Sequence, residues 1–240
     1  MAFVSGKDPW ILKDYFWQDL QHVPNYYYQE VASYLKEGDV VLDAGCGSGE
    51  FGVMKVHGGP AGKIVGVDIS NESLSRNQVV DERIVSSLEQ LPSPDNSFDL
   101  VVCETVCEHL AHPQKVFSEF SRVLKKGGHV LIRTYNIWNI NNAVSAFLPL
   151  PVRKIIKGQF ISAPNEGTFP TYYRCNSRRR LNKLFDQAGM DEVSFMVYRD
   201  CVSYWNNRAI LTFFTVYEKI TDLPLLNAAK MHLVGVYRKR

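Results

Sequence analysis

The residues best suited to chemistry are three glycines and an aspartate in VLDAGCGSGE, residues 41–50. Gly45, Gly47 and Gly49 follow an apolar run, so a strand leads into a turn without Cβ atoms, where backbone N–H groups can approach a ligand closely. The spacing is G-x-G-x-G and not the G-x-G-x-x-G of dinucleotide sites, and Asp43 would repel a pyrophosphate. The segment therefore predicts a nucleotide-type site that prefers a cationic group beside Asp43.

A second carboxylate, Asp68, ends the next apolar run in the segment GVDIS. A carboxylate at that strand end can accept hydrogen bonds from both hydroxyls of an unphosphorylated ribose. An amino group near Asp43 and a ribose near Asp68 together fit S-adenosylmethionine, which joins a zwitterionic methionine to adenosine and carries no phosphate.

The elements that must position these residues alternate between strands and helices. Short β-branched runs separated by helix-period segments predict βαβ units and a parallel sheet. We expect a crossover helix from Pro113 to Lys125, ended by Gly127 and Gly128, because its apolar residues share one stripe. The expected strands of this core are Val40–Asp43, Lys63–Asp68, Arg83–Ser86, Phe98–Cys103 and His129–Arg133.

The pattern changes after Thr134. Residues 135–170 are interrupted by prolines and rich in Asn, which predicts a lid or acceptor-binding insertion. A basic amphipathic contact of residues 143–161 with a membrane surface is the alternative, and the prolines favour the lid. A helix capped by Asn176 or Ser177 and closed at Gly189 is expected next, followed by a strand through Val193, Phe195 and Val197 and a last strand at His232–Tyr237.

Length and composition favour one domain of 240 residues. Within it we expect an N-terminal helical cover (1–37), a cofactor-binding core (38–135), the lid or acceptor insertion (136–175) and the C-terminal part of the sheet (176–240). The net charge of +2 is too small to argue for a nucleic-acid partner. Five scattered cysteines, no apolar leader and no run of 18 apolar residues predict a cytoplasmic chain without a transmembrane segment, and leave its oligomeric state open.

Four segments resemble, in order and spacing, the motifs of class I S-adenosylmethionine-dependent methyltransferases: VLDAGCGSGE, GVDIS, LPSPDNSFDLVVCETVCEHL and RVLKKGGHVLI. The resemblance covers roughly residues 38–135. It implies an α/β fold with a Rossmann-like doubly wound seven-stranded sheet, mostly parallel with one antiparallel strand, which we expect at His232–Tyr237. S-adenosyl-L-methionine would bind over the carboxyl ends of the first strands, where open α/β sheets hold ligands.

The resemblance also implies which residues bind the cofactor. Residues 43–49 would cradle its methionine part, Asp68 and Ile69 its ribose, and Ser87 with Leu88 would flank the adenine. Family members often carry Asp where Ser87 stands, so we expect the side-chain bond to the adenine amino group to be weaker or remade here, while the backbone contact at Leu88 is kept. The complete expected set is Asp43, Ala44, Gly45, Cys46, Gly47, Gly49, Asp68, Ile69, Ser70, Ser87, Leu88, Glu104 and Thr105.

Glu104, Thr105, Glu108 and His109 follow the fourth expected strand, at the mouth where a methyl group would meet its acceptor. Methyl transfer is an in-line displacement that depends mainly on alignment and exclusion of water, so a base is optional. For a hydroxyl acceptor, His109 is the candidate general base, with Glu108 beside it. The competing interpretation is that both only fix the loop by hydrogen bonds. No metal is expected, because Thr105 stands where a Glu-x-x-Glu-His metal cluster needs its first Glu.

A basic and aromatic cluster, Tyr172, Tyr173 and Arg174, is the candidate substrate-binding set. The rings could stack on a sugar or ring and Arg174 could pair with an acid, whereas a solvated helix start is the competing interpretation. The segment TFPTYYRCNSRRRLNKLFDQAGM is similar to segments of bacterial methyltransferases associated with cell-surface glycans. We therefore expect a small-molecule, glycan or lipid-linked acceptor.

We expect O-methylation, with N- or C-methylation of another small metabolite as the alternative. Two other classes remain open, a nucleotide-binding oxidoreductase and a non-catalytic cofactor-binding protein. The glycine spacing and Asp43 disfavour the first, and the intact loop with Asp68 disfavours the second.

Overall fold

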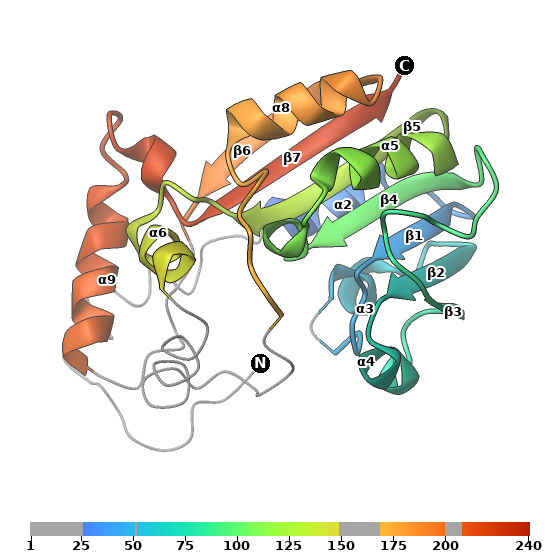
Figure 1. Cartoon of the computed structure of the whole chain (residues 1–240), viewed down its shortest axis with the longest axis horizontal. Helices are drawn as coiled ribbons and strands as arrows, with labels where there is room; N and C mark the ends of the chain where they lie inside the picture. Colours follow the sequence, from blue (N-terminus) through green and yellow to red (C-terminus); the bar gives the residue numbers. More distant parts are fainter. Residues whose placement is uncertain (1–25, 51, 149–168, 200–207) are drawn as a thin grey trace. The chain divides into compact units, whose positions relative to one another are not determined.

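The computed structural model describes residues 26–50, 52–148, 169–199 and 208–240. Its centre is a seven-stranded sheet with the strand order β3-β2-β1-β4-β5-β7-β6 (Figure 1). Strands β1 to β5 pair in parallel, and β7 runs opposite to both of its neighbours in Figure 1. The expected α/β sheet with its reversed strand near His232–Tyr237 is thus confirmed. The strands are β1 (Val40–Ala44), β2 (Lys63–Asp68), β3 (Glu82–Val85), β4 (Phe98–Glu104), β5 (Leu124–Tyr135), β6 (Met190–Tyr198) and β7 (His232–Lys239).

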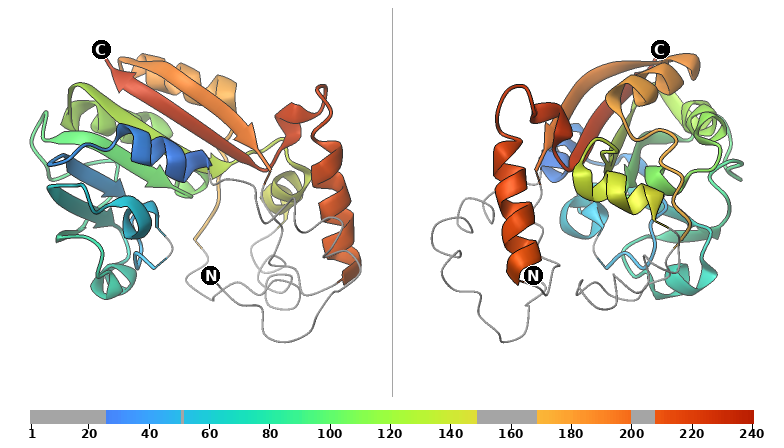
Figure 2. Two further views of the ribbon diagram at one scale, coloured as in Figure 1. Left: turned by 180° about the vertical axis from the view of Figure 1, so that it is seen from behind. Right: turned by 60° about the vertical axis from the view of Figure 1, so that its left-hand side comes forward.

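The central strands are apolar because helices cover both faces of the sheet. Leu42 in β1, Val101 in β4 and Leu131 in β5 have no exposed surface. Helices α5 (Pro113–Val123) and α8 (Arg178–Gln187) lie over one face in Figure 1, and α2 (Tyr26–Tyr34) lies over the opposite face in Figure 2. Burial on both faces explains why the strands read as near-continuous β-branched runs and not as alternating ones.

An aromatic stack joins the two helices of the first face to the sheet. The ring of Phe185 in α8 lies 4.2 Å from the ring of Phe117 in α5 and 3.8 Å from that of Tyr237 in β7, centroid to centroid. All three side chains are fully buried. Rings of this size contribute much of the apolar area in a core, so this stack fixes α5 and α8 on the sheet.

One local expectation was wrong, and another is met in position only. The crossover helix ends at Val123 and β5 already begins at Leu124, which pairs with Phe98 in β4, so the two glycines lie inside the strand. Ser177 does occupy the N-cap position of α8, but its side chain makes no capping hydrogen bond. The amide of Asn176 donates instead to Thr134 Oγ1 (2.8 Å) and to the carbonyl of Tyr135 (2.9 Å), so it caps no helix.

The described residues form two compact units. The sheet unit comprises Asn25–Tyr135, Thr171–Met196 and Leu233–Arg240, and it contains every expected cofactor-binding residue. In this unit α3 (Val53–His57) follows the glycine turn and α4 (Asn71–Arg76) follows β2. Because β1, β2 and β4 are parallel neighbours, their carboxyl ends meet at one edge of the sheet, where a ligand would sit.

The second unit takes its described residues from Asn136–Pro170 and Val197–His232, with helices α6 (Ile140–Phe147) and α9 (Arg208–Ile220). Three of its asparagines have a structural role. The buried amides of Asn136, Asn139 and Asn142 donate to carbonyls of residues 228–231 over 2.8–3.1 Å. Buried carbonyls need such donors, so the asparagines of this segment hold an irregular chain section in place.

Some expectations lie outside the described residues. The N-terminal cover (1–37) is described only from Tyr26, where α2 is anchored by Tyr27, whose hydroxyl donates to the carbonyl of Leu131 over 3.4 Å. Most of the insertion, residues 149–168, is likewise not described. Among the helices that the structure describes, none has the length and apolar character needed to cross a membrane.

Candidate functional site

The glycine turn after β1 uses conformations that side chains avoid. Gly45, Gly47 and Gly49 have φ angles of +78°, +49° and +69°, in the left-handed region. A Cβ on Gly45 would strike the Val106 side chain, and one on Gly49 would lie 2.5 Å from Asn77 Oδ1. A Cβ on Gly47 would meet nothing within 4 Å. Gly45 and Gly49 are therefore needed for packing, whereas Gly47 borders open space in which a ligand could contact the backbone.

Asp68 holds this turn from the end of β2. One carboxylate oxygen accepts the N–H of Gly47 (2.9 Å) and the other accepts the N–H of Ser70 (2.7 Å), the residue whose hydroxyl caps α4. Each carboxylate oxygen has two lone pairs, so both retain capacity for a further donor. Ile69, the next residue, is 68 % exposed, so its side chain flanks the Asp68 position on the solvent side.

Asp43 is a buried carboxylate at the end of β1. It is 8 % exposed, and among the described residues its side chain has no hydrogen-bond partner. Burial raises its pKa to about 7, and the nearby carboxylates of Glu104 and Asp68 add to the shift. A buried carboxylate that lacks hydrogen bonds is costly, and a bound cation would remove that cost. The site thus attracts positive charge to the end of β1.

Glu104 is close to Asp43 but already has partners. Its carboxylate binds Arg133 Nη1 at 2.8 Å and accepts the N–H of Val53, the first residue of α3, at 3.0 Å. Burial raises its pKa, although Arg133 opposes the shift. Thr105 follows with φ +54°, a rare value for a β-branched residue, and its hydroxyl donates to the carbonyl of Glu104. Of the acids at this edge, Asp43 is therefore better placed than Glu104 to receive a ligand.

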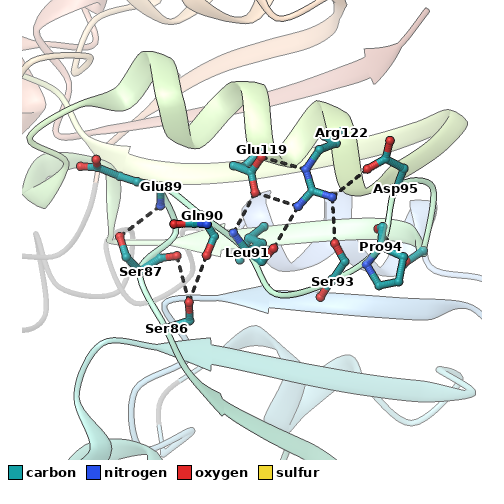
Figure 3. Close-up of polar contacts among 11 residues, drawn as sticks. Ser86, Ser87, Glu89, Gln90, Leu91, Ser93, Pro94, Asp95, Glu119 and Arg122 are labelled. Atoms are coloured by element: carbon teal, nitrogen blue, oxygen red, sulfur yellow. Dashed lines mark hydrogen bonds and ion pairs between the residues drawn. The ribbon is translucent and has the colours of Figure 1, made fainter.

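The loop expected to flank an adenine is fixed by an arginine in α5, as Figure 3 shows. The Arg122 guanidinium forms two 2.8 Å bonds with the Glu119 carboxylate and also binds Asp95 Oδ1 and the carbonyls of Ser93 and Leu91. Glu119 in turn accepts the N–H of Leu91 at 2.8 Å. A planar guanidinium can donate several hydrogen bonds at once. Arg122 therefore fixes the far end of the loop that carries the adenine-flanking residues.

The near end of the same loop is a compact turn. Ser87 Oγ accepts the N–H of Glu89 at 3.2 Å, and the carbonyl of Ser87 accepts the N–H of Gln90. Leu88 between them is 9 % exposed. Ser87 and Leu88 therefore lie in an ordered turn after β3, and the Ser87 hydroxyl already has a backbone partner.

Glu108, in the short 3-10 helix Cys107–His109 after β4, is held in a buried polar chain. Thr134 donates to Glu108 Oε2 at 2.8 Å, and Asn176 donates to Thr134 Oγ1 at 2.8 Å. Burial raises the pKa of Glu108 to about 7, while the hydrogen bond from Thr134 lowers it. Glu108 Oε1 lies 4.0 Å from His109 Nε2, and the His109 side chain is 32 % exposed. His109 can thus face both solvent and a carboxyl group that titrates near neutrality.

Tyr172 and its neighbours pack directly against this helix. The N–H groups of Tyr172 and Tyr173 both donate to the carbonyl of Glu108, at 2.7 and 3.2 Å, and Arg174 donates to the carbonyl of Ala111. Arg174 also lies over the Tyr172 ring, 5.4 Å from its centroid. Tyr172 is 46 % exposed, whereas Tyr173 is 8 % exposed and has φ +50°. Of the three expected substrate residues, Tyr172 offers the accessible ring.

The structure joins Gly47 to Asp68 by a hydrogen bond and packs Tyr172 and Tyr173 against Glu108, and it adds four residues that sequence reasoning missed. Ala44, the last residue of β1, and Cys46 in the turn are both buried, so they can contribute backbone groups only. The missed residues are Asn77, Arg122 and Thr134, together with Asn176, which was expected only as a helix cap. All four act through tertiary contacts. Within the described part of the chain, no group of three or more His, Cys, Asp or Glu side chains is arranged to hold a metal.

Residues 42–132 match a family described as "Methyltransferase domain". An uncharacterized methyltransferase of Schizosaccharomyces pombe is 31 % identical over 144 residues, which are 54 % of this chain and 50 % of that protein. A ubiquinone/menaquinone biosynthesis C-methyltransferase of Cupriavidus taiwanensis is 28 % identical over 180 residues, 67 % of this chain and 71 % of the relative. The chain spans about half the length of the first relatives it matches.

A solved structure of a SAM-dependent methyltransferase from Methanosarcina mazei superposes with a TM-score of 0.60 at 20 % sequence identity. The match covers 88 % of this chain and 96 % of that one. At this identity the likeness shows the fold. The matched segment of 42–132 contains the glycine turn, Asp68, the loop before β4 and the residues after it.

Proposed function

We propose that the chain carries a class I S-adenosylmethionine-dependent methyltransferase domain, which binds S-adenosyl-L-methionine at the carboxyl ends of β1, β2 and β4 and methylates a small-molecule acceptor. The observation that carries this proposal is the pairing of an open glycine backbone at Gly47 with a buried, unpartnered carboxylate at Asp43. The first fits close backbone contact and the second fits an ammonium group.

Each part of the cofactor has a chemically matched position. The methionine part would lie along the glycine turn with its ammonium near Asp43, and the ribose hydroxyls would donate to the spare lone pairs of Asp68. When bound, S-adenosylmethionine supplies an electrophilic methyl group that an acceptor atom displaces in line. The carboxylates of Asp43, Asp68 and Glu104 favour a cationic cofactor over a phosphorylated one, because they would repel phosphate.

We further propose that the acceptor atom is a hydroxyl oxygen and that His109 takes its proton. His109 combines partial exposure with a nearby carboxyl, so it can hold a proton at Nε2 and pass it to solvent. Tyr172, with its exposed ring beside Arg174, would contact a sugar or aromatic acceptor. The likeness to C-methyltransferases named for quinone biosynthesis favours a second candidate, carbon methylation of a hydroxylated ring.

Both candidates can be tested together with S-adenosylmethionine carrying a 13C-labelled methyl group. The purified chain is incubated with panels of hydroxylated sugars and phenols, and products are examined by NMR. A methoxy carbon resonance supports oxygen methylation, and an aryl-methyl resonance supports the carbon alternative. Label on neither, despite measurable cofactor binding, would reduce the proposal to a cofactor-binding protein.

A further inference from the structure

Both polar atoms of the Asn77 side chain form hydrogen bonds, one with the glycine turn and the other with the residues that follow α4. It is fully buried at the C-cap of α4. Its Nδ2 donates to the carbonyls of Cys46 (3.3 Å) and Gly47 (3.1 Å), and its Oδ1 accepts the N–H groups of Val79 (2.9 Å) and Val80 (3.3 Å). One amide thus ties two segments that are thirty residues apart in sequence to each other.

The pattern of partners requires an amide at position 77. Two carbonyl oxygens face one end of the side chain and need a donor, while two N–H groups face the other end and need an acceptor. An ionised Asp is an acceptor at both ends, and an apolar residue satisfies neither. The buried environment leaves unmatched groups without water to replace the lost bonds.

Asn77 and Asp68 hold the two ends of the same residue, Gly47. Asp68 accepts its N–H, and Asn77 donates to its C=O. Asn77 also packs against Gly49, where a Cβ would lie 2.5 Å from Oδ1. The left-handed conformation of Gly47, which leaves its backbone open to a ligand, is therefore fixed from both sides.

We propose that Asn77 is a positioning residue, which keeps the glycine turn in the shape that receives the methionine part of the cofactor. It acts through Gly47, which Asp68 also binds, and it does not touch the ligand. This inference rests on the proposed function for the identity of the ligand, whereas the holding of the turn can be measured without any ligand.

The test compares Asn77→Ala and Asn77→Asp with the wild-type chain by isothermal titration with S-adenosylhomocysteine between pH 5.5 and 8.5. Asn77→Ala should weaken binding about tenfold or more, as expected for the loss of both hydrogen bonds that hold the glycine turn. Asn77→Asp should bind almost normally while its buried carboxyl is protonated, since the acid form keeps one donor and one acceptor. Its affinity relative to wild type should then fall as pH rises and the carboxyl ionises.

A merely structural role for Asn77 would not make the ratio of the Asn77→Asp affinity to the wild-type affinity depend on pH. Gln78→Ala, at the exposed neighbouring position, is the matched surface control, and Leu74→Ala destabilises α4 from its buried side. Both should bind S-adenosylhomocysteine within about twofold of wild type at temperatures where they remain folded. Melting temperatures of all variants are recorded, so that titrations use folded protein only.

Amide hydrogen exchange gives the second readout. In Asn77→Ala the Gly47 amide should exchange faster than in wild type, while amides in the middle of β4 keep their protection. Unchanged Gly47 exchange, or S-adenosylhomocysteine affinity within twofold of wild type for both variants at every pH, overturns the inference. If the wild-type chain does not bind S-adenosylhomocysteine but the Gly47 amide of Asn77→Ala exchanges faster, the proposed function is refuted. The role of Asn77 in holding the turn is then still established.

Discussion

The backbone N–H of Gly47 donates to the Asp68 carboxylate over 2.9 Å, which links the turn after β1 to the end of β2. The residue expected to bind a ribose therefore also shapes the turn expected to bind the methionine part. The two halves of the candidate site are therefore structurally coupled, and a substitution in one half should weaken ligand binding in the other.

Asp68→Ala should weaken S-adenosylhomocysteine binding by more than the loss of ribose contacts alone, because the N–H groups of Gly47 and Ser70 both lose their acceptor. We expect a loss of about 2–4 kcal/mol, or roughly thirtyfold to a thousandfold. Titration calorimetry measures the loss, and methionine alone and adenosine alone serve as fragment ligands. Unchanged methionine binding would contradict the structural link between the two halves.

Gly45→Ala and Gly47→Ala form a matched pair that separates packing from binding. Both place an L residue at positive φ, which costs about 1–2 kcal/mol. Gly45→Ala also drives a Cβ into Val106 and should lower the melting temperature further. Gly47→Ala has space for its Cβ and should mainly lose cofactor affinity. Native S-adenosylhomocysteine affinity in folded Gly47→Ala would show that the ligand does not approach this backbone.

Cofactor affinity should rise with pH through the titration of Asp43. The pKa of Asp43 is about 7 in the free protein, and an ammonium favours the ionised form, so binding lowers that pKa and releases a proton. Binding at pH 6 should be about tenfold weaker than at pH 8 and should level off above pH 8. Asp43→Asn should bind weakly at every pH. A wild-type affinity that is flat from pH 6 to 8 would argue against an ammonium beside Asp43.

Thr134→Val should destabilise the fold by about 1–3 kcal/mol, because it leaves the buried Glu108 carboxyl and the Asn176 amide without their shared partner. Thr134→Ser keeps the hydroxyl and should recover most of that loss. Urea unfolding measures both free energies. The loss of a bond that favours ionised Glu108 should also raise the Glu108 pKa above about 7. Equal stability of the Val and Ser variants would exclude a bonding role for Thr134.

His109→Ala should leave S-adenosylhomocysteine affinity within about twofold of wild type while it slows methyl transfer to a hydroxyl acceptor by about 10²–10⁴-fold. The reason is that His109 would remove a proton from the acceptor and not hold the cofactor. Single-turnover rates with an acceptor from the screen give the comparison, and His112→Ala, a more exposed histidine bonded to Glu89, is the control. An unchanged rate would make His109 a structural residue.

Those parts of the fold that depend on local pattern were predictable from the sequence. Strands β1, β2 and β4 were placed within a residue of their observed bounds, because buried parallel strands form apolar runs. The end of α5 was misplaced because Lys125 and Lys126 before two glycines look like a helix terminus, whereas Leu124 pairs with Phe98 of β4. Helix α9 was not predicted, since its sequence is rich in β-branched and aromatic residues.

Site residues that belong to a sequence motif were predictable. Site residues that act only through contacts with distant parts of the chain were not. Gly47 and Asp68 stand in motifs, and the structure brings them into hydrogen-bond contact. Asn77 has no motif of its own, and its function depends on the folded position of the turn some thirty residues earlier. Thr134 and Asn176 are ordinary polar residues in sequence, and only the sheet brings them to Glu108.

Titration of the wild-type chain with S-adenosylhomocysteine, run beside NADH under the same conditions, tests the central claim most directly. We predict micromolar binding of S-adenosylhomocysteine, proton release below neutral pH and no binding of NADH, whose pyrophosphate would meet Asp43 and Asp68. Binding of NADH, or of neither compound, would contradict the assignment of this site to S-adenosylmethionine.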